Sequence, residues 1–367
     1  MENKPVKLMI PGPVEVHPDV LQAMGSQVVP HYGAAWVEKY GKLLAVLKQI
    51  FGTSSDVFLM TGSGTAAIDA CLGSSLSTGE KVIIGNNGFF GDRLVSVAEH
   101  NGLRVVQVKT DWGKRLLPAD FEKAIQQNPD AHMIAVVHCE TSTTVMNPVE
   151  EIGPIARRHG LLFFVDAVSA LGGVPYAMDD WCVDLCASAS QKCLGAPPGL
   201  AIVAVNSRAW EFINRDSLKA HGWYTDLSVW KKYSIDWADW HPTPITMATS
   251  IVNALSVSLK QLMEEGIPAR MQRFRQLALQ LREGLRSTGM PPFTPDEGMS
   301  PVLTAAFPPK DVPSPRIVEY LLKEHGIQIS TGLGELHDRI FRIGHMSPIL
   351  TSADIEQMLQ ALRKFKA

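Results

Sequence analysis

Between residues 57 and 205 the sequence alternates between short apolar runs and longer helix-like segments. Strands that are separated by helical crossovers form a mostly parallel sheet with helices on both faces. Ligands of such sheets bind beyond the carboxyl ends of the strands. The expected strands are 57–60, 81–85, 104–108, 133–137 and 161–166, and the expected helices begin at Thr65, Phe90, Pro118 and Val149. We therefore predict an α/β protein whose functional residues follow its strands.

A lysine occupies a tight loop near the end of this alternation. Lys192 lies in the segment 188–199, SASQKCLGAPPG, between the strand-like runs 183–187 and 200–205. Small polar residues precede it, and a rigid stretch containing two prolines and a glycine follows it. An isolated loop lysine is usually an ordinary surface residue. Its neighbours in the sequence argue for a function here.

Upstream of the lysine, an aspartate ends a strand. Five apolar residues, 161–165, lead directly to Asp166, and a run of this kind is typical of a strand that is covered on both faces. A carboxylate at the end of a buried strand is costly unless it has a cationic partner. Pyridoxal phosphate (PLP) chemistry uses such a pair: a lysine that bonds to the aldehyde carbon and an aspartate that keeps the pyridine nitrogen protonated.

A glycine turn before a helix supplies a third element. The segment 61–76, TGSGTAAIDACLGSSL, follows an apolar run, and its Gly62 and Gly64 allow a sharp turn. Ser63 and Thr65 add hydroxyl groups, and the free amides of the helix start can bind a phosphate. A purely structural glycine turn would look the same. The order of phosphate loop, aspartate and lysine makes PLP binding the better interpretation.

Seven motifs in this order resemble the class V aminotransferases of fold type I, and within them the alanine–glyoxylate and serine–glyoxylate group. They are PGP (11–13), GSGT (62–65), NGFFGDR (87–93), HCETSTTV (138–145), VDAVSALGG (165–173), SQKCLGAPPG (190–199) and FRIGHM (341–346). The resemblance implies a large PLP-binding domain, with a mostly parallel sheet of the seven-stranded type covered by helices, and a smaller C-terminal α/β domain.

The resemblance also implies roles for single residues. Phe90 would stack on the pyridine ring, Thr141 would contact the ring hydroxyl, and Gln191 would contact the phosphate. Thr243 would reach the cofactor phosphate of a neighbouring subunit, which implies a homodimer with shared active sites. The complete set of expected cofactor contacts is Ser63, Gly64, Thr65, Phe90, Thr141, Asp166, Val168, Gln191, Lys192 and Thr243.

Arg342 is the candidate for binding the substrate carboxylate, because a guanidinium group can make two parallel hydrogen bonds to a carboxylate. Arg339 is the alternative, and Gly12 is expected to bring backbone close to the same carboxylate. Three positions depart from the usual pattern: Thr144, Thr331 and Ser347. We expect each to add a polar side chain near the pocket and to affect the choice of amino donor.

The expected domains are an N-terminal arm (1–22), a large PLP-binding domain (23–255) and a small C-terminal domain (256–367). The motif Gly266-Ile267-Pro268 predicts a break between two long helices. Trp223, Trp230 and Trp237 are spaced by seven residues. We interpret them as a buried helix stripe or a subunit contact rather than as substrate contacts.

The net charge of −3 and the pI of about 6.4 give no reason to expect nucleic acid or a membrane surface as a partner. No signal peptide or spanning segment is recognisable, so a cytoplasmic location is expected. The five cysteines have no framework or metal-ligand spacing. We therefore expect core or loop thiols in a reducing compartment and no metal site.

The expected reaction is a ping-pong transamination. A small amino acid, alanine or serine, replaces Lys192 on the cofactor, and the freed amine of Lys192 moves the α-proton. Glyoxylate or pyruvate then takes up the amino group. The alternatives are another class V enzyme (a ureidoglycine or pyridoxamine transaminase, a lyase or a desulfurase) and a PLP-binding protein without turnover. A nicotinamide dehydrogenase requires GxGxxG after its first strand, and GSGTAA does not match it.

Overall fold

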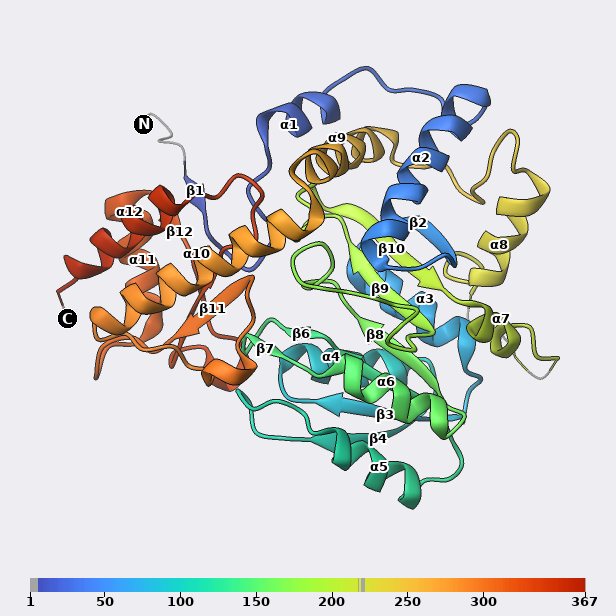
Figure 1. Cartoon of the computed structure of the whole chain (residues 1–367), viewed down its shortest axis with the longest axis horizontal. Coiled ribbons are helices and arrows are strands. Elements are labelled where there is room, and N and C mark those ends of the chain that lie inside the picture. Colours follow the sequence, from blue (N-terminus) through green and yellow to red (C-terminus); the bar gives the residue numbers. More distant parts are fainter. Residues whose placement is uncertain (1–5, 217, 219–221, 367) are drawn as a thin grey trace.

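The computed structural model describes residues 6–216, 218 and 222–366. Its centre is a seven-stranded sheet with the strand order β2-β10-β9-β8-β5-β3-β4 (Figure 1). Only β10 runs antiparallel to its neighbours, so the prediction of a mostly parallel α/β sheet is confirmed. The strands are β2 (Asp56–Gly62), β3 (Lys81–Asn86), β4 (Arg104–Lys109), β5 (Ala131–Val137), β8 (Leu162–Asp166), β9 (Leu185–Ala189) and β10 (Gly199–Val205).

Helices cover this sheet, and most of them follow one of its strands in the chain. They are α2 (Ala34–Phe51), α3 (Gly64–Ser75), α4 (Phe89–His100), α5 (Pro118–Gln127), α6 (Val149–Arg158), α7 (Ser207–Ile213) and α8 (Leu227–Asp236). The sequence placed the starts of α5 and α6 correctly and those of α3 and α4 one residue late. All residues of β8 and β9 are buried, as expected for strands with helices on both faces.

The C-terminal part contains a three-stranded sheet with the order β11-β14-β13 (orange and red in Figure 1). Its elements are α9 (Thr249–Glu265), α10 (Ile267–Ser287), β11 (Leu303–Ala306), α11 (Ser314–His325), β13 (Ser330–Thr331), β14 (Phe341–Gly344) and α12 (Ser352–Arg363). The predicted break between α9 and α10 lies at Gly266, whose φ of +88° favours glycine. The expected domain boundary after residue 255 lies inside α9, and the division into domains stays a prediction.

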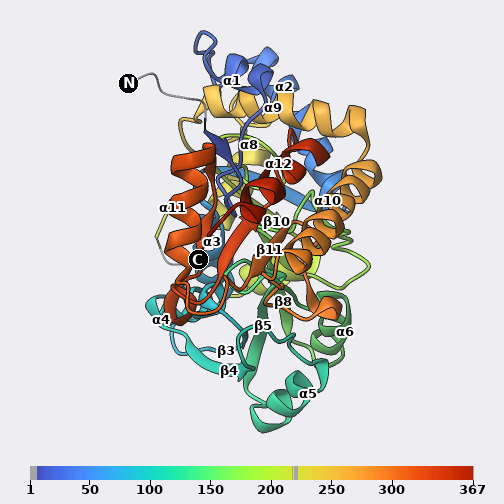
Figure 2. The ribbon, with the colours of Figure 1, turned by 90° about the vertical axis from the view of Figure 1, so that its left-hand side faces the viewer.

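An N-terminal segment, residues 7–15, connects this small sheet to the lysine loop, which is the loop 190–198 that carries Lys192 between β9 and β10. β1 (Lys7–Leu8) pairs with β12 (Ile327–Gln328), and the carbonyl of Met9 accepts a hydrogen bond from Gly344. Farther along, the amide of Val14 donates to the carbonyl of Gln191. Figure 2 shows β1 beside the C-terminal elements. The segment falls within the expected arm, of which residues 1–5 lie outside the described residues.

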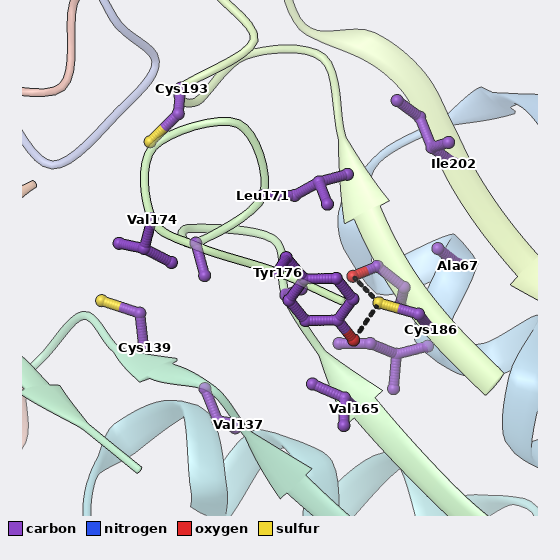
Figure 3. Close-up of a cluster of buried hydrophobic side chains, with 14 of the residues drawn as sticks. Ala67, Val137, Cys139, Val165, Leu171, Val174, Tyr176, Cys186, Cys193 and Ile202 are labelled. Carbon is purple, nitrogen blue, oxygen red and sulfur yellow. Dashed lines mark hydrogen bonds between the residues drawn. The ribbon is translucent and has the colours of Figure 1, made fainter. Parts of the chain in front are cut away.

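The core beneath the lysine loop contains most of the cysteines (Figure 3). The hydroxyl of Tyr176 donates to Cys186 Sγ over 3.0 Å, next to Val165 and Leu171. Cys71, Cys139, Cys186 and Cys193 are buried, and Cys182 is half-buried. Among residues 6–216, 218 and 222–366, no three His, Cys, Asp or Glu side chains are grouped as metal ligands.

The three spaced tryptophans do not form a buried helix stripe, and that interpretation was wrong. Trp230 is fully buried, but 54% of Trp223 and 43% of Trp237 are exposed. Trp223 precedes α8, and Trp237 lies at its end, so the three residues do not share one helix face. In the described part of the chain, no helix is both long and apolar enough to span a membrane.

Two short strands and three short helices complete the described part of the chain. β6 (Cys139–Glu140) and β7 (Val145–Met146) form a small ribbon beyond the end of β5. α1 (Pro18–Met24) packs against α9. The 3₁₀ helices η1 (Asp296–Gly298) and η2 (Gly334–Leu336) lie in the C-terminal part.

Candidate active site

A cavity of about 430 Å³ lies at the carboxyl ends of the parallel strands. Ten of the twelve residues predicted from the sequence line it: Gly12, Ser63, Gly64, Thr65, Phe90, Thr141, Asp166, Val168, Gln191 and Lys192. Motifs that are far apart in the sequence therefore lie side by side at the strand ends. Arg342 and Thr243 are not in the cavity wall.

Lys192 lies in the loop between the antiparallel strands β9 and β10 and is 9% exposed. Its Nζ donates a hydrogen bond to the carbonyl of Pro11. Gly12 is so close that a Cβ there would come within 2.7 Å of Nζ, and its φ is +112°. Burial lowers the pKa of Lys192 to about 8. The amine can therefore act as a base near neutral pH.

Asp166 is the last residue of β8, as predicted, and it is buried. One carboxylate oxygen accepts a hydrogen bond of 2.9 Å from the amide of Val168. Burial raises the pKa of Asp166 to about 6, against the effects of this hydrogen bond and of the charge on Lys192. A buried carboxylate of this kind is stabilised by a cationic partner, such as a protonated ring nitrogen.

The glycine turn lies at the start of α3. Ser63 is its N-cap residue and makes no capping hydrogen bond through its side chain, so the first amides of the helix can bind an anion. A Cβ on Gly64 would come within 2.6 Å of Val168, so this close contact requires glycine. Gln191 lines the cavity, and the NH₂ group of its side-chain amide can donate hydrogen bonds to a phosphate. These groups fit the phosphate end of PLP.

Phe90 lies in the first turn of α4, and its half-buried ring forms part of the cavity wall. The guanidinium of Arg93 lies 4.9 Å from the centre of this ring and also lines the cavity. Thr141 shares a hydrogen bond of 2.8 Å with Ser169. We did not predict roles for Arg93 or Ser169, although Arg93 is one helical turn after Phe90 in the motif NGFFGDR.

Arg342 lies on β14, and backbone carbonyls fix its guanidinium. Nε donates to Thr331 over 2.8 Å, and Nη1 donates to Thr141 over 3.1 Å. Because Thr141 lines the cavity, Arg342 lies directly behind the cavity wall. Burial lowers the pKa of Arg342 to about 10, so it stays cationic near neutral pH. Arg339, the alternative, is exposed and lines a separate hollow.

None of the three departures from the motif pattern lines the cavity. Thr144 bonds to the Thr294 hydroxyl and has a φ of +62°, which explains why glycine suits this position. Thr331 holds Arg342 through its carbonyl, and the Ser347 hydroxyl donates to Glu15. Thr243 also lies outside the cavity, and its hydroxyl donates to Ile245 within the same chain. Its contact with a second subunit stays a prediction.

Comparisons with known proteins agree with this geometry. The sequence profile described as Aminotransferase class-V matches residues 18–347. An uncharacterized aminotransferase of Methanocaldococcus jannaschii is 36% identical over 92% of this chain and 87% of its own length. The crystal structure of an alanine–glyoxylate aminotransferase from Nostoc sp. is 33% identical, with a TM-score of 0.93, over 99% of this chain and 96% of that chain.

A second crystal structure, the ureidoglycine–glyoxylate aminotransferase of Bacillus subtilis, is 30% identical, with a TM-score of 0.91. The match covers 99% of this chain and 93% of that one. Profile, sequence and structure thus agree over nearly the whole chain. The protein therefore belongs to the class V aminotransferases, which are PLP-dependent transaminases of fold type I.

Proposed function

We propose that this enzyme moves the amino group of a small amino acid, alanine or serine, to glyoxylate or pyruvate by a ping-pong mechanism. The observation that carries the proposal is the cavity that joins Lys192, Asp166 and the glycine turn, with Arg342 directly behind its wall. Related proteins include an alanine–glyoxylate and a ureidoglycine–glyoxylate aminotransferase, both of which use glyoxylate by name.

Bound PLP supplies an aldehyde carbon for an amine and a ring that can accept electrons. The start of α3 and Gln191 hold the phosphate, and Phe90 covers one face of the ring. Asp166 keeps a proton on the ring nitrogen. The proposed clamp for the substrate carboxylate is Arg342, because two backbone carbonyls have already fixed the direction of its fork.

Lys192 is the proposed base. With PLP and substrate bound, the freed amine of Lys192 would take up and release the α-proton of the substrate. Its low pKa favours the uncharged amine that this step needs. The backbone at Gly12 limits the space around this amine.

A desulfurase is the less favoured alternative, because the cysteines of the site are poor nucleophiles. Cys139 lines the cavity and Cys193 follows the lysine, and burial raises the pKa of each to about 12. Their thiolates are therefore scarce at neutral pH. A ureidoglycine or pyridoxamine transaminase would use the same residues, so only substrates can separate it from the proposed function.

The test is a half-reaction panel. The purified enzyme is mixed with one amino acid at a time, and the band of lysine-bound cofactor is followed as it converts to that of pyridoxamine phosphate. Rapid conversion by alanine or serine is expected, and rapid conversion by pyridoxamine or ureidoglycine alone would replace the proposed donor. Borohydride reduction and peptide mapping should place the cofactor on Lys192, and a label on any other lysine would refute the site.

We also propose a homodimer, supported by an exposed aromatic patch made of Tyr32, Trp223, Trp237 and Trp240. Rings of this patch contact one another, as in the pair Trp237 and Trp240 at 5.6 Å between ring centres. Exposed apolar groups on this scale typically mark an interface. Sedimentation should give a dimer for the natural protein and a monomer for Trp237→Glu. A dimer of unchanged stability in the variant would place the interface elsewhere.

A further inference from the structure

The helix that carries Phe90 is capped by residues from another loop. The N-cap residue of α4 is Gly88, which has no side chain to cap the first amides. Instead, the amide of Phe89 donates to Ser142 Oγ over 2.9 Å. The amides of Phe90 and Gly91 donate to Glu140 Oε2 over 3.1 and 2.9 Å. Glu140 at the end of β6 and Ser142 just after it thus satisfy all three amides.

Donors surround both oxygens of the Glu140 carboxylate. Oε1 accepts from the amide and the hydroxyl of Ser142, at 3.0 and 2.5 Å, while Oε2 faces the helix. The side chain is fully buried. Burial raises the pKa of Glu140, and the hydrogen bonds from Ser142, Gly91 and Phe90 act in the opposite direction. A carboxylate suits this place because it is the side-chain group that only accepts hydrogen bonds.

Glycine at position 88 makes this contact possible. A Cβ there would lie 2.4 Å from the carboxyl carbon of Glu140 and 2.5 Å from Ser142 Oγ, far inside contact distance. The loop from 140 to 142 also serves the rest of the site, since Thr141 lines the cavity and its carbonyl holds Arg342. One short segment therefore fixes both the aromatic wall and the substrate arginine.

We propose that Glu140 is a positioning residue that holds the Phe90 ring against the face of the cofactor by capping α4 from the neighbouring loop. The proposal rests on the proposed stacking of Phe90. Glu140 acts through the backbone of Phe90 and touches neither cofactor nor substrate. Its effect on cofactor binding should therefore disappear when the Phe90 ring is absent.

Glu140→Gln is the informative substitution, because it keeps the shape but turns one oxygen into an NH₂ group. Whichever oxygen the NH₂ group replaces, it then faces N–H or O–H donors instead of an acceptor. At least one backbone amide therefore loses its acceptor. We expect the dissociation constant of PLP to rise about tenfold, which corresponds to about 1.4 kcal/mol. Affinity for inorganic phosphate, measured by competition, should stay unchanged, because the phosphate loop is separate.

A double-mutant cycle with Phe90→Ala tests the mechanism. PLP affinity is measured by equilibrium dialysis for the natural protein, both single variants and the double variant. Glu140→Gln should have less than about a twofold effect in the Phe90→Ala background if it acts through the ring. Phe89→Ala is the matched control, because Phe89 packs edge-on against Phe90 at 5.6 Å but does not line the cavity. In that background Glu140→Gln should keep its full effect.

The outcomes separate this inference from the function on which it rests. If Phe90→Ala weakens PLP binding and the two effects add, Glu140 acts through its charge or through general stability, and the inference is wrong. If Phe90→Ala leaves PLP affinity unchanged, the stacking role falls and the inference falls with it. Should Glu140→Gln fail to fold, Ser142→Ala removes one donor to Glu140 and the acceptor of Phe89. Its smaller effect, about threefold, should show the same dependence on Phe90.

Discussion

Lys192 should make the stability of the cofactor-free protein depend on pH in a way that one substitution removes. Burial lowers its pKa to about 8 from an ordinary value of 10.5. Between these values the unfolded chain keeps the proton that the folded protein has lost. The unfolded state then binds more protons, so the free energy of unfolding rises with pH in this range.

The gap between the two pKa values corresponds to about 3 kcal/mol, of which about 2 kcal/mol should be regained between pH 8 and pH 10. Lys192→Met keeps an apolar chain of similar length and removes the titrating amine. Urea unfolding of both cofactor-free proteins, followed by circular dichroism, measures the difference. Natural protein should gain about 2 kcal/mol relative to the variant over this pH range.

Other titrating groups affect both proteins equally, so the difference isolates the amine. Parallel pH curves for natural protein and variant would refute the argument. They would mean that water reaches Nζ, or that the contact with Pro11 holds the ammonium form as well as solvent does. The lysine would then need its cofactor to become a base.

The other predictions concern Asp166, Arg342 and Thr144. Asp166→Asn should slow the half-reaction about 100-fold in stopped-flow measurements, because the amide cannot hold the ring nitrogen protonated, and an unchanged rate would exclude this role. Arg342→Lys should weaken the transition-state binding of amino acid and oxo acid alike by about 2 to 3 kcal/mol, because the paired hydrogen bonds are lost. The loss is measured as a lower kcat/KM. The PLP content of this variant should stay normal, and loss of PLP would reassign the clamp. Thr144→Gly should unfold with a free energy about 1 kcal/mol higher than that of Thr144→Ala, because only glycine adopts a φ of +62° without strain. Equal stabilities would show that the backbone relaxes there, and neither variant should change donor preference.

The sequence predicts the main sheet and most of the site for a simple physical reason. Buried parallel strands are continuous apolar runs, and polar residues that follow them must meet at one edge. Asp166 and the glycine turn before α3 could be placed in this way. Roles such as that of Phe90 required the family motifs, because a single phenylalanine after a strand looks like any core residue.

The remaining features depend on contacts that no local pattern records. The short segment 327–331 is divided between two sheets, because Ile327–Gln328 pairs with β1 and Ser330–Thr331 pairs with β14. The tryptophan spacing suggested a helix face because seven residues make two turns, but the helix begins only at Leu227. Glu140 caps the helix of Phe90 although the two residues are 50 positions apart in the sequence. A buried carboxylate just after β5 was nevertheless a signal that donors had to be found for it.

The N-terminal segment has a consequence for synthesis on the ribosome. Residues 7–15 are translated long before their partners Ile327, Gln328, Gly344 and Ser347. The backbone groups of residues 7–9 therefore lack their native partners until residues 327–344 have been translated, whereas Pro11 and Val14 pair with Lys192 and Gln191. The large sheet can form before that moment, since domains fold as their residues emerge. A chain that has not yet reached β12 and β14 would then hold this segment only through its contacts with Gln191 and Lys192.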